Sequence, residues 1–424
     1  MAARWSLRTV LLPVHRYVGL LLALFLALAG LTGSLLAWNE ELEAVISPQL
    51  FRVAAPAPGA ARIDPLQLHE QVRARYPAAF VARVPLEQTA GRSVMFALRA
   101  LPGKGAGKGG PLANDQVFVD PYTGQTLGER RWGDISQGSK NLMPFIYRLH
   151  YSLALDGIGT LIFGVVSLLW TLDCFVGAWL TFPRRREHHD GGRHGAAPIW
   201  LARWWPSWQL RSGSVYKISF NLHRAGGLWT WALLLVLAWS SVAFNLPQVY
   251  EPAMKTLFSH QRGMDSIARL KKPRMAPAIG WEPALLLARQ QMAAEARTRG
   301  FVVEAEKSLL YDPVRGVYRY DVRSSSDIRH RGGHTRMVID GDSGVVRGLW
   351  LPTGAASGDT VTTWLTTLHM AALGGWPVQL LMSVMGLAVL MLSVTGVVVW
   401  WKKRAGRGKQ GARMVQRGEP AGSV

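Results

Sequence analysis

The sequence predicts an α+β membrane protein, with four transmembrane helices in two tandem repeats and two α/β modules outside the bilayer. Three observations predict this fold class. Four apolar segments, each with at most one charged residue, are long enough to cross a membrane. Histidines near their ends recur at matched spacings, and two long polar stretches share one order of helix and strands. Residues 1–45, 141–183, 218–249 and 361–402 are therefore assigned to the four helices, residues 46–140 and 250–360 to the modules, and residues 184–217 and 403–424 to a basic loop and a basic tail.

Each apolar segment has the length that a hydrocarbon core of about 30 Å requires. Hydrophobic residues make up 49% of the 424 residues. We draw the spans at residues 17–38, 157–182, 225–246 and 371–401. The first span runs on into AWNEELEAV without a small-residue cleavage site, so we expect it to anchor the chain and not to be removed as a signal peptide.

Basic residues predict the orientation, because loops rich in Lys and Arg stay on the cytoplasmic side of a membrane. Arg4 and Arg8 precede the first span, seven basic residues lie in 184–217, and seven follow the last span. Both termini and the middle loop are therefore expected in the cytoplasm, and the modules on the opposite side. The net charge of +21 follows from this topology and indicates contact with lipid headgroups, not with nucleic acid.

The two outer stretches read as copies of one module. In the first, IDPLQLHEQVRARYP predicts a helix, and RSVMFALRA and QVFVDPYTGQTLGER predict strands; in the second, WEPALLLARQQMAAEA precedes GVYRYDVRS and TRMVIDGDSGVVRGLW. Asp120 and Gly124 of DPYTG match Asp340 and Gly344 of DGDSG at an offset of 220. Asp that bonds nearby amides and Gly with positive φ are typical of a turn between strands, so we interpret the pattern as a fold marker and not as a catalytic motif.

Four histidines stand near the ends of the apolar segments. His15 and His223 are 208 residues apart, and His150 and His369 are 219 apart. A single histidine at this depth is commonly hydrogen-bonded or directed at headgroups. Four histidines at duplicated positions indicate paired ligands of a metal or of haem iron, for which neutral imidazole is a common ligand.

The direction of the helices decides which histidines can pair. His15 and His223 begin the two outward-running helices at the cytoplasmic face, and His150 and His369 begin the two inward-running helices at the other face. Two imidazoles at one depth can hold one iron from opposite sides, whereas pairing across leaflets would leave them about a membrane thickness apart. The sequence therefore predicts two haem groups, one near each leaflet, held by His15 with His223 and by His150 with His369.

A straight helix from His150 to Phe182 would be about 48 Å long at 1.5 Å per residue, which exceeds the hydrocarbon core. We therefore expect the helix either to protrude from the bilayer or to break. The two places where a break is expected are Asp156-Gly157 and Gly374-Gly375.

Other polar residues near the histidines have two readings each. Arg16 and Arg224 directly follow His15 and His223, and they suit either haem propionates or positive-inside anchoring. Arg148 could act likewise, although its register partner is Thr367. Asp173 lies within the second span and its register partner is Leu392, so it is read as a proton relay or, more commonly for such residues, as a satisfied buried carboxyl.

The histidines, the segments VHRYVGLLLAL, RLHYSLALDGIGTLIFG and TLHMAALGGWPVQLLM, and the paired DPYTG and DGDSG hairpins resemble the PepSY-associated transmembrane family of bacterial inner-membrane proteins. The resemblance covers nearly the whole chain and implies that residues 46–140 and 250–360 are periplasmic PepSY-like modules. The family includes iron-regulated proteins and FoxB-type siderophore reductases. The resemblance therefore implies b-type haem in the membrane and reduction of ferric siderophores on the periplasmic face.

The expected function is that of an oxidoreductase, a ferric-siderophore reductase of the inner membrane. The cytoplasmic pieces are too short for a flavin or nicotinamide domain, so the electron donor is expected to be membrane quinol or a cytoplasmic reductant. Cys174 is the only cysteine, which excludes disulfides in the modules. Two alternatives stay open: a haem-free module for signalling or peptidase regulation, and a quinol-linked cytochrome b with another acceptor.

Overall fold

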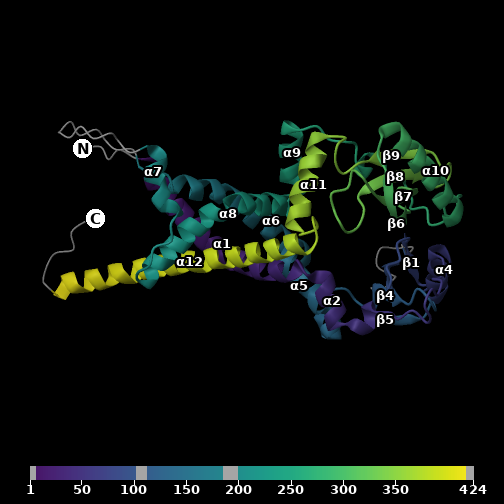
Figure 1. The fold of residues 1–424 in the computed structure, drawn as a ribbon, viewed down its shortest axis with the longest axis horizontal. Helices are drawn as coiled ribbons and strands as arrows, with labels where there is room; N and C mark the ends of the chain where they lie inside the picture. The colour runs from purple at the N-terminus through teal and green to yellow at the C-terminus, as the bar shows by residue number, and fades with distance from the viewer. Residues whose placement is uncertain (1–5, 102–111, 185–198, 417–424) are drawn as a thin grey trace. The chain divides into compact units, whose positions relative to one another are not determined.

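The computed structural model describes residues 6–101, 112–184 and 199–416, the last ten of these for their backbone alone. The chain divides into two compact units (Figure 1). The helical unit contains residues 1–37, 149–250 and 380–424, and the sheet unit contains residues 38–148 and 251–379. Both helices and sheets are present, as the fold class requires.

Four helices in the described residues are long and apolar enough to cross a membrane: α1 Leu7–Leu36, α6 Asp156–Leu180, α8 Val215–Asn245 and α12 Trp376–Gln416. The prediction of four spans is confirmed. Helices α1 and α8 begin about ten residues before the spans drawn from the sequence. The reason is that helical hydrogen bonding continues beyond the apolar run, so His15 and His223 lie inside helices and not at their first residues.

Small residues let α1 and α12 approach each other closely. A Cβ atom on Gly386 would lie 2.5 Å from the Gly30 carbonyl oxygen, and a Cβ on Gly30 would lie 2.5 Å from the Gly386 carbonyl oxygen. Beside them, Ser34 donates to the Ser383 carbonyl at 2.9 Å, and Ser383 donates to the Ser34 carbonyl at 2.9 Å. Such contacts suit helices in lipid, where close packing and hydrogen bonds between helices replace the hydrophobic effect.

The predicted helix breaks are confirmed. Helix α5, Leu142–Ser152, ends before α6, and Leu153, Ala154 and Asp156 have φ between 50° and 56°. Helix α11, Ser357–His369, is separated from α12 by a connector in which Ala371, Gly374 and Gly375 have positive φ. The expectation that His150 and His369 begin the membrane helices is wrong, because each lies near the end of the short helix before the break.

The first sheet of the sheet unit has the strand order β1-β3-β4-β5 and is antiparallel throughout. Its strands are β1 Ala79–Val81, β3 Val94–Ala100, β4 Gln116–Val119 and β5 Thr126–Arg130. Helix α4, Pro65–Arg75, covers one face with Leu68 and Val72, which pack on Phe96 and Val117. The predicted helix and strands of the first module are therefore present.

The second sheet has the order β2-β6-β7-β8-β9. Its strands are β2 Arg83–Pro85, β6 Val303–Asp312, β7 Val317–Ser324, β8 Thr335–Asp340 and β9 Val346–Trp350, and helix α10, Trp281–Arg299, packs on it. Strand β2 comes from the first module, and its Val84 is fully buried in the core of the second. The sequence did not predict this exchange, since three residues are too few to show an alternating pattern.

The two Asp-Gly patterns form the expected turns. Asp120 Oδ1 accepts from the Tyr122 amide at 2.7 Å, and Gly124 has φ of 71°. Asp340 Oδ1 accepts from the Ser343 amide at 3.0 Å, and Gly344 has φ of 70°. Their carboxylates are used by the hairpins themselves.

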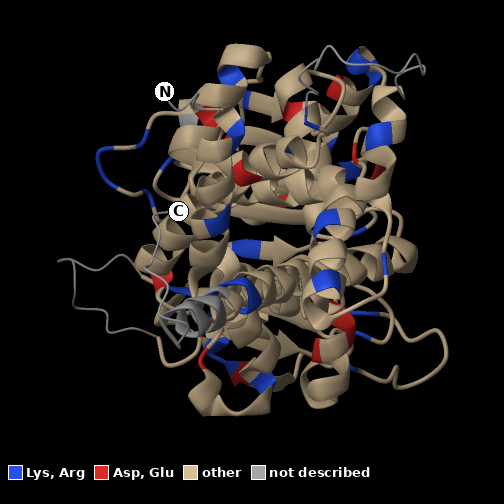
Figure 2. Cartoon of the chain, turned by 90° about the vertical axis from the view of Figure 1, so that its left-hand side faces the viewer, with Lys and Arg blue, Asp and Glu red and all other residues tan. Residues whose placement is uncertain are grey.

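The remaining helices are short. They are α2 Asn39–Ile46, α3 Pro48–Phe51, α7 Trp200–Trp204 and α9 Pro247–Leu257, with 3₁₀ turns at Ile135–Gln137, Ser139–Asn141, Trp205–Trp208 and Met264–Ser266. Figure 2 shows the long helices of the helical unit close to end-on, tan along most of their length with blue Lys and Arg segments near the viewer. Basic residues thus gather at this end of the helices, which is the pattern that places it on the cytoplasmic side in the sequence-based prediction.

Candidate functional site

The rings of His15 and His223 face each other within the helical unit. His15 lies on α1 and His223 on α8, and their ring centroids are 6.1 Å apart with an angle of 55° between the ring planes. The structure thus brings together the first of the two predicted pairs, although 208 residues separate its members.

A carboxylate holds the first ring. His15 Nδ1 lies 2.8 Å from Asp173 Oδ1 of α6, and the side chains of His15 and Asp173 are 26% and 12% exposed. A carboxylate accepts a hydrogen bond, so His15 donates its Nδ1–H, and in the neutral ring the lone pair is then on Nε2. The contact gives the Asp173 carboxylate a hydrogen-bond partner, and the two interpretations of Asp173, a proton relay and a satisfied buried carboxyl, both stay predictions.

A backbone carbonyl holds the second ring. His223 Nδ1 lies 3.0 Å from the Leu392 carbonyl oxygen of α12 and 3.3 Å from Thr395 Oγ1. Because a carbonyl can only accept, His223 is also protonated at Nδ1 and carries its lone pair on Nε2. In the described part of the chain, neither Nε2 atom has a hydrogen-bond partner.

Two glycines make room for the two rings. A Cβ on Gly177 would lie 3.2 Å from His15 Cε1, and a Cβ on Gly396 would lie 3.2 Å from His223 Cε1. Gly177 lies four residues after Asp173, and Gly396 lies four residues after Leu392. In both helices the glycine is therefore on the same face as the group that accepts the hydrogen bond, one turn further along.

This arrangement fits an iron atom held by two imidazoles. Two metal–nitrogen bonds of about 2 Å, together with a distance of roughly 1 Å from each nitrogen to its ring centre, span about 6 Å, and the centroids are 6.1 Å apart. Neutral rings with Nδ1 tied to the protein present Nε2 as the ligand atom. The residues present are therefore compatible with bis-histidine haem ligation.

His150 has a related environment. Its Nδ1 lies 3.0 Å from Thr32 Oγ1 of α1, and that hydroxyl donates to the Leu28 carbonyl at 2.7 Å, so its oxygen is left to accept from the ring. A Cβ on Gly33 would lie 3.1 Å from His150 Cε1. Here too, a ring held at Nδ1 packs against a glycine. Its predicted partner His369 belongs to the sheet unit, so the pairing of these two residues stays a prediction.

The loop between β7 and β8 holds the end of α11, where His369 lies. Arg329 donates to Thr367 Oγ1 at 3.1 Å and to Thr366 Oγ1 at 3.3 Å. His330 donates through its amide at 3.0 Å and through Nδ1 at 2.6 Å to the Ala372 carbonyl, which follows the helix. The support of His369 by this loop could not be predicted from the sequence, because the contacts cross about 40 residues.

The three arginines near the histidines differ in their contacts. Arg224 donates to the Pro206 carbonyl at 2.8 Å and to Asn221 Oδ1 at 3.1 Å. Arg148 donates to the Gly133 carbonyl at 3.2 Å. Arg16 is half-buried and makes no hydrogen bond or ion pair within the described ranges. Arg224 thus fixes the neighbouring loop, whereas no described residue engages the guanidinium of Arg16.

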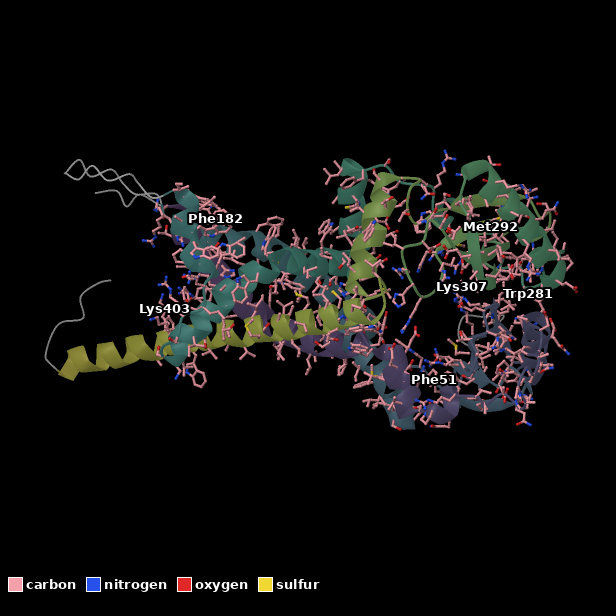
Figure 3. The ribbon with its side chains drawn as sticks, viewed as in Figure 1. Phe51, Phe182, Trp281, Met292, Lys307 and Lys403 are labelled. Carbon is pink, nitrogen blue, oxygen red and sulfur yellow. The ribbon has the colours of Figure 1, made fainter. Side chains whose placement is uncertain are left out.

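One end of the helical unit carries an aromatic cluster, formed by Phe182, Trp200, Trp204 and Trp208 with ring centroids 5.1–5.4 Å apart. Arg8 caps the end of α6 through the carbonyl of its last residue, Leu180, and also donates to the Phe182 carbonyl at 3.0 Å. Figure 3 places Phe182 and Lys403 toward the same end of the helices, so α6 and α12 run in one direction. Tryptophan and arginine together at helix ends are typical of a membrane interface.

Among the described residues, the other histidines form no cluster of metal ligands. Within the ranges that the structure describes, no group of three or more His, Cys, Asp and Glu side chains is placed to hold a metal ion. His334 accepts from Arg336 at 3.1 Å, and burial, followed by Arg329 and Arg336, lowers its pKa to about 3. His188, His189 and His194 lie outside the described residues.

The fold and these contacts define an α+β membrane protein with four membrane-spanning helices and a histidine pair between two of them. The sequence matches the family described as the PepSY-associated TM region over residues 12–403, and the chain belongs to this family. No curated protein matches the sequence significantly.

Proposed function

We propose that this protein is a bacterial inner-membrane electron carrier that holds two haem b groups and reduces ferric siderophores in the periplasm. The observation that carries the proposal is the facing pair His15 and His223, with ring centroids 6.1 Å apart and both Nδ1 atoms bound to the protein. Haem held by two such ligands supplies a one-electron carrier in the membrane.

The residues around the pair have separate tasks. Asp173 and the Leu392 carbonyl fix the ring tautomers, so that each Nε2 keeps a lone pair. Gly177 and Gly396 leave the space in which the rings stand. Arg16 is half-buried and without an acceptor among the described residues, which suits it to a haem propionate, and Arg224 can contribute its remaining donors.

The second haem is proposed to lie between His150 and His369, nearer the periplasm. Support comes from the matched spacing of 219 residues and from the environment of His150, which repeats the combination of a held Nδ1 and an adjacent glycine. The matched spacings also support two tandem repeats and two PepSY-like modules. One module is the first sheet with helix α4, and the other is the second sheet with helix α10. The basic ends of the helices support cytoplasmic termini and periplasmic modules.

Reduction is a chemically sensible way to release siderophore iron. Hard oxygen ligands hold Fe(III) far better than Fe(II), so one electron loosens the chelate. Electrons are proposed to enter from membrane quinol or a cytoplasmic reductant and to leave from the periplasmic side. In this proposal the protein binds the two haem groups at different depths of the membrane and excludes water from them.

An absorption spectrum of protein purified from haem-replete cells tests the cofactor. We expect low-spin b-type bands and two haems per chain. His15→Ala and His223→Ala should each remove the same haem, and His150→Ala and His369→Ala the other. A colourless protein would favour the haem-free signalling module, and equal partial loss in all four variants would contradict two separate sites.

Reoxidation tests the substrate. Dithionite-reduced protein, freed of excess reductant, should be reoxidised by a ferri-siderophore while Fe(II) appears in a chelator assay. If quinone reoxidises the protein and no ferric chelate does, the reductase proposal fails and a quinol-linked cytochrome b replaces it.

A further inference from the structure

The hydrogen-bond acceptors of His15 and His223 differ in charge. The 219-residue register places Asp173 of α6 at the position of Leu392 in α12, and both residues lie four positions before a glycine that packs against a ring. In the first case a carboxylate accepts from the imidazole at 2.8 Å, and in the second a backbone carbonyl accepts at 3.0 Å. The residue at this register position therefore accepts the hydrogen bond from a histidine ring in both helices, through a side-chain carboxylate at Asp173 and through the main-chain carbonyl at Leu392.

The fold does not need a carboxylate at this position. Leucine occupies it in α12, and its own carbonyl is enough to hold a ring. An aspartate inside an apolar span is costly unless it has a partner, and within the described chain the only side-chain hydrogen-bond or ion-pair partner of Asp173 is His15. Holding the His15 ring in place therefore does not by itself explain why this position carries a carboxylate.

A carboxylate polarises an imidazole more strongly than a neutral carbonyl does. Hydrogen bonds to ionised acceptors are roughly twice as strong as neutral ones, and a carboxylate on the far nitrogen of a metal-bound histidine raises the basicity of the ligand nitrogen. A more basic ligand stabilises Fe(III) over Fe(II). The ligand pair is then unequal, with the stronger donor on α1.

We propose that Asp173 is a positioning residue that makes His15 the stronger of two unequal iron ligands and thereby lowers the reduction potential of the haem between His15 and His223. The inference rests on the proposed function, because it requires haem at this pair. It adds that the carrier nearer the cytoplasm is tuned to pass its electron onward, by a side chain that the second half of the chain lacks.

Spectroelectrochemical titration of the full-length protein tests this inference. Asp173→Asn keeps an acceptor of the same shape without the charge, and we expect it to retain haem while the potential of the His15–His223 haem shifts upward. Asp173→Leu, which copies the residue at 392, should shift it further and weaken haem binding about 10- to 100-fold. The potential of the other haem should not move in either variant.

Thr395→Val is the matched control. It removes the 3.3 Å contact to His223 and the bonds that the hydroxyl donates to the Met391 and Leu392 carbonyls, but it leaves the Leu392 carbonyl itself in place. The potential of this variant should stay close to that of the wild type. An unchanged potential in haem-loaded Asp173→Asn overturns the inference, and slowed turnover at unchanged potential would assign Asp173 to proton transfer instead. A wild-type protein without haem overturns the proposed function as well, so the two failures are distinguishable.

Discussion

At the residue scale, the site depends on two glycines, because their lack of a side chain leaves room for the histidine rings. Gly177 and Gly396 stand against His15 and His223, and each leaves a ring free to reach an acceptor one helical turn away. The absence of a Cβ thus matters as much as the imidazoles themselves. The sequence shows these glycines 27 residues after His150 and His369, but their contacts are with the other pair.

Replacing Gly177 by valine should displace the His15 ring, because even the first added carbon would lie 3.2 Å from Cε1. We expect the absorption spectrum to show loss or high-spin conversion of one haem while the other stays intact. Gly157→Ala, near the other end of α6, is the control, since a Cβ there meets nothing within 4 Å. Full low-spin haem content in Gly177→Val would contradict the assigned role.

His334 predicts a pH dependence of the sheet unit. Burial, then Arg329 and Arg336, lowers its pKa from 6.5 to about 3. Above pH 6.5 the ring is neutral in both states; between the two values the unfolded chain binds a proton that the folded chain does not. The free energy of unfolding should therefore fall as the pH falls, by at most about 1.4 kcal/mol per pH unit.

Thermal unfolding of wild type and His334→Gln between pH 7.5 and 4 checks this sign. The wild type should lose more stability than the variant as the pH falls, with little difference in slope above pH 7. Parallel curves across the range would show that the protonation of His334 is not coupled to folding.

At the element scale, packing of the helices depends on close backbone approach between α1 and α12. Gly30 and Gly386 occupy the crossing, and the serine pair Ser34 and Ser383 donates across it in both directions. Both residues of the glycine pair meet backbone, which cannot move aside as a flexible side chain can.

Gly386→Leu should separate these helices and destabilise the helical unit by roughly 1–3 kcal/mol, the usual cost of overpacking. The readout is the thermal midpoint of the detergent-solubilised protein. Gly157→Ala serves as a control because a Cβ there has open space. An unchanged midpoint in Gly386→Leu would mean that α1 and α12 do not depend on this contact.

At the scale of the whole molecule, strand exchange couples the two modules within the sheet unit. Strand β2 leaves the first module, pairs with β6, and places Val84 in the core beneath α10. Residues 46–140 and 250–360 are therefore not independent in folding, whatever their separation along the chain.

Val84→Ala should lower the stability of the second sheet by about 1–3 kcal/mol, because it leaves a cavity in a core to which the first module contributes. Hydrogen exchange of β6, β7 and β8 measures the effect. Val45→Ala, at a position 66% exposed, is the control. Unchanged exchange in these strands would show that β2 is dispensable.

The sequence by itself determined the four spans, the breaks before α6 and α12, and the two Asp-Gly turns. Each follows from local properties: the length of an apolar run, the reach of a helix against the bilayer, and the chemistry of four or five neighbouring residues. Matched spacing also sufficed to predict that His15 and His223 lie together.

Only the tertiary structure decided what holds the rings and where β2 belongs. Asp173 meets His15 across 158 positions, and the acceptor for His223 is the main chain of Leu392, which no side-chain pattern can reveal. The tertiary structure also shows that His150 and His369 belong to α5 and α11 and not to the membrane-spanning helices. Such contacts depend on how the helices pack against one another. Helix packing is set by residues far apart in the sequence, so it cannot be predicted from the residues of one segment.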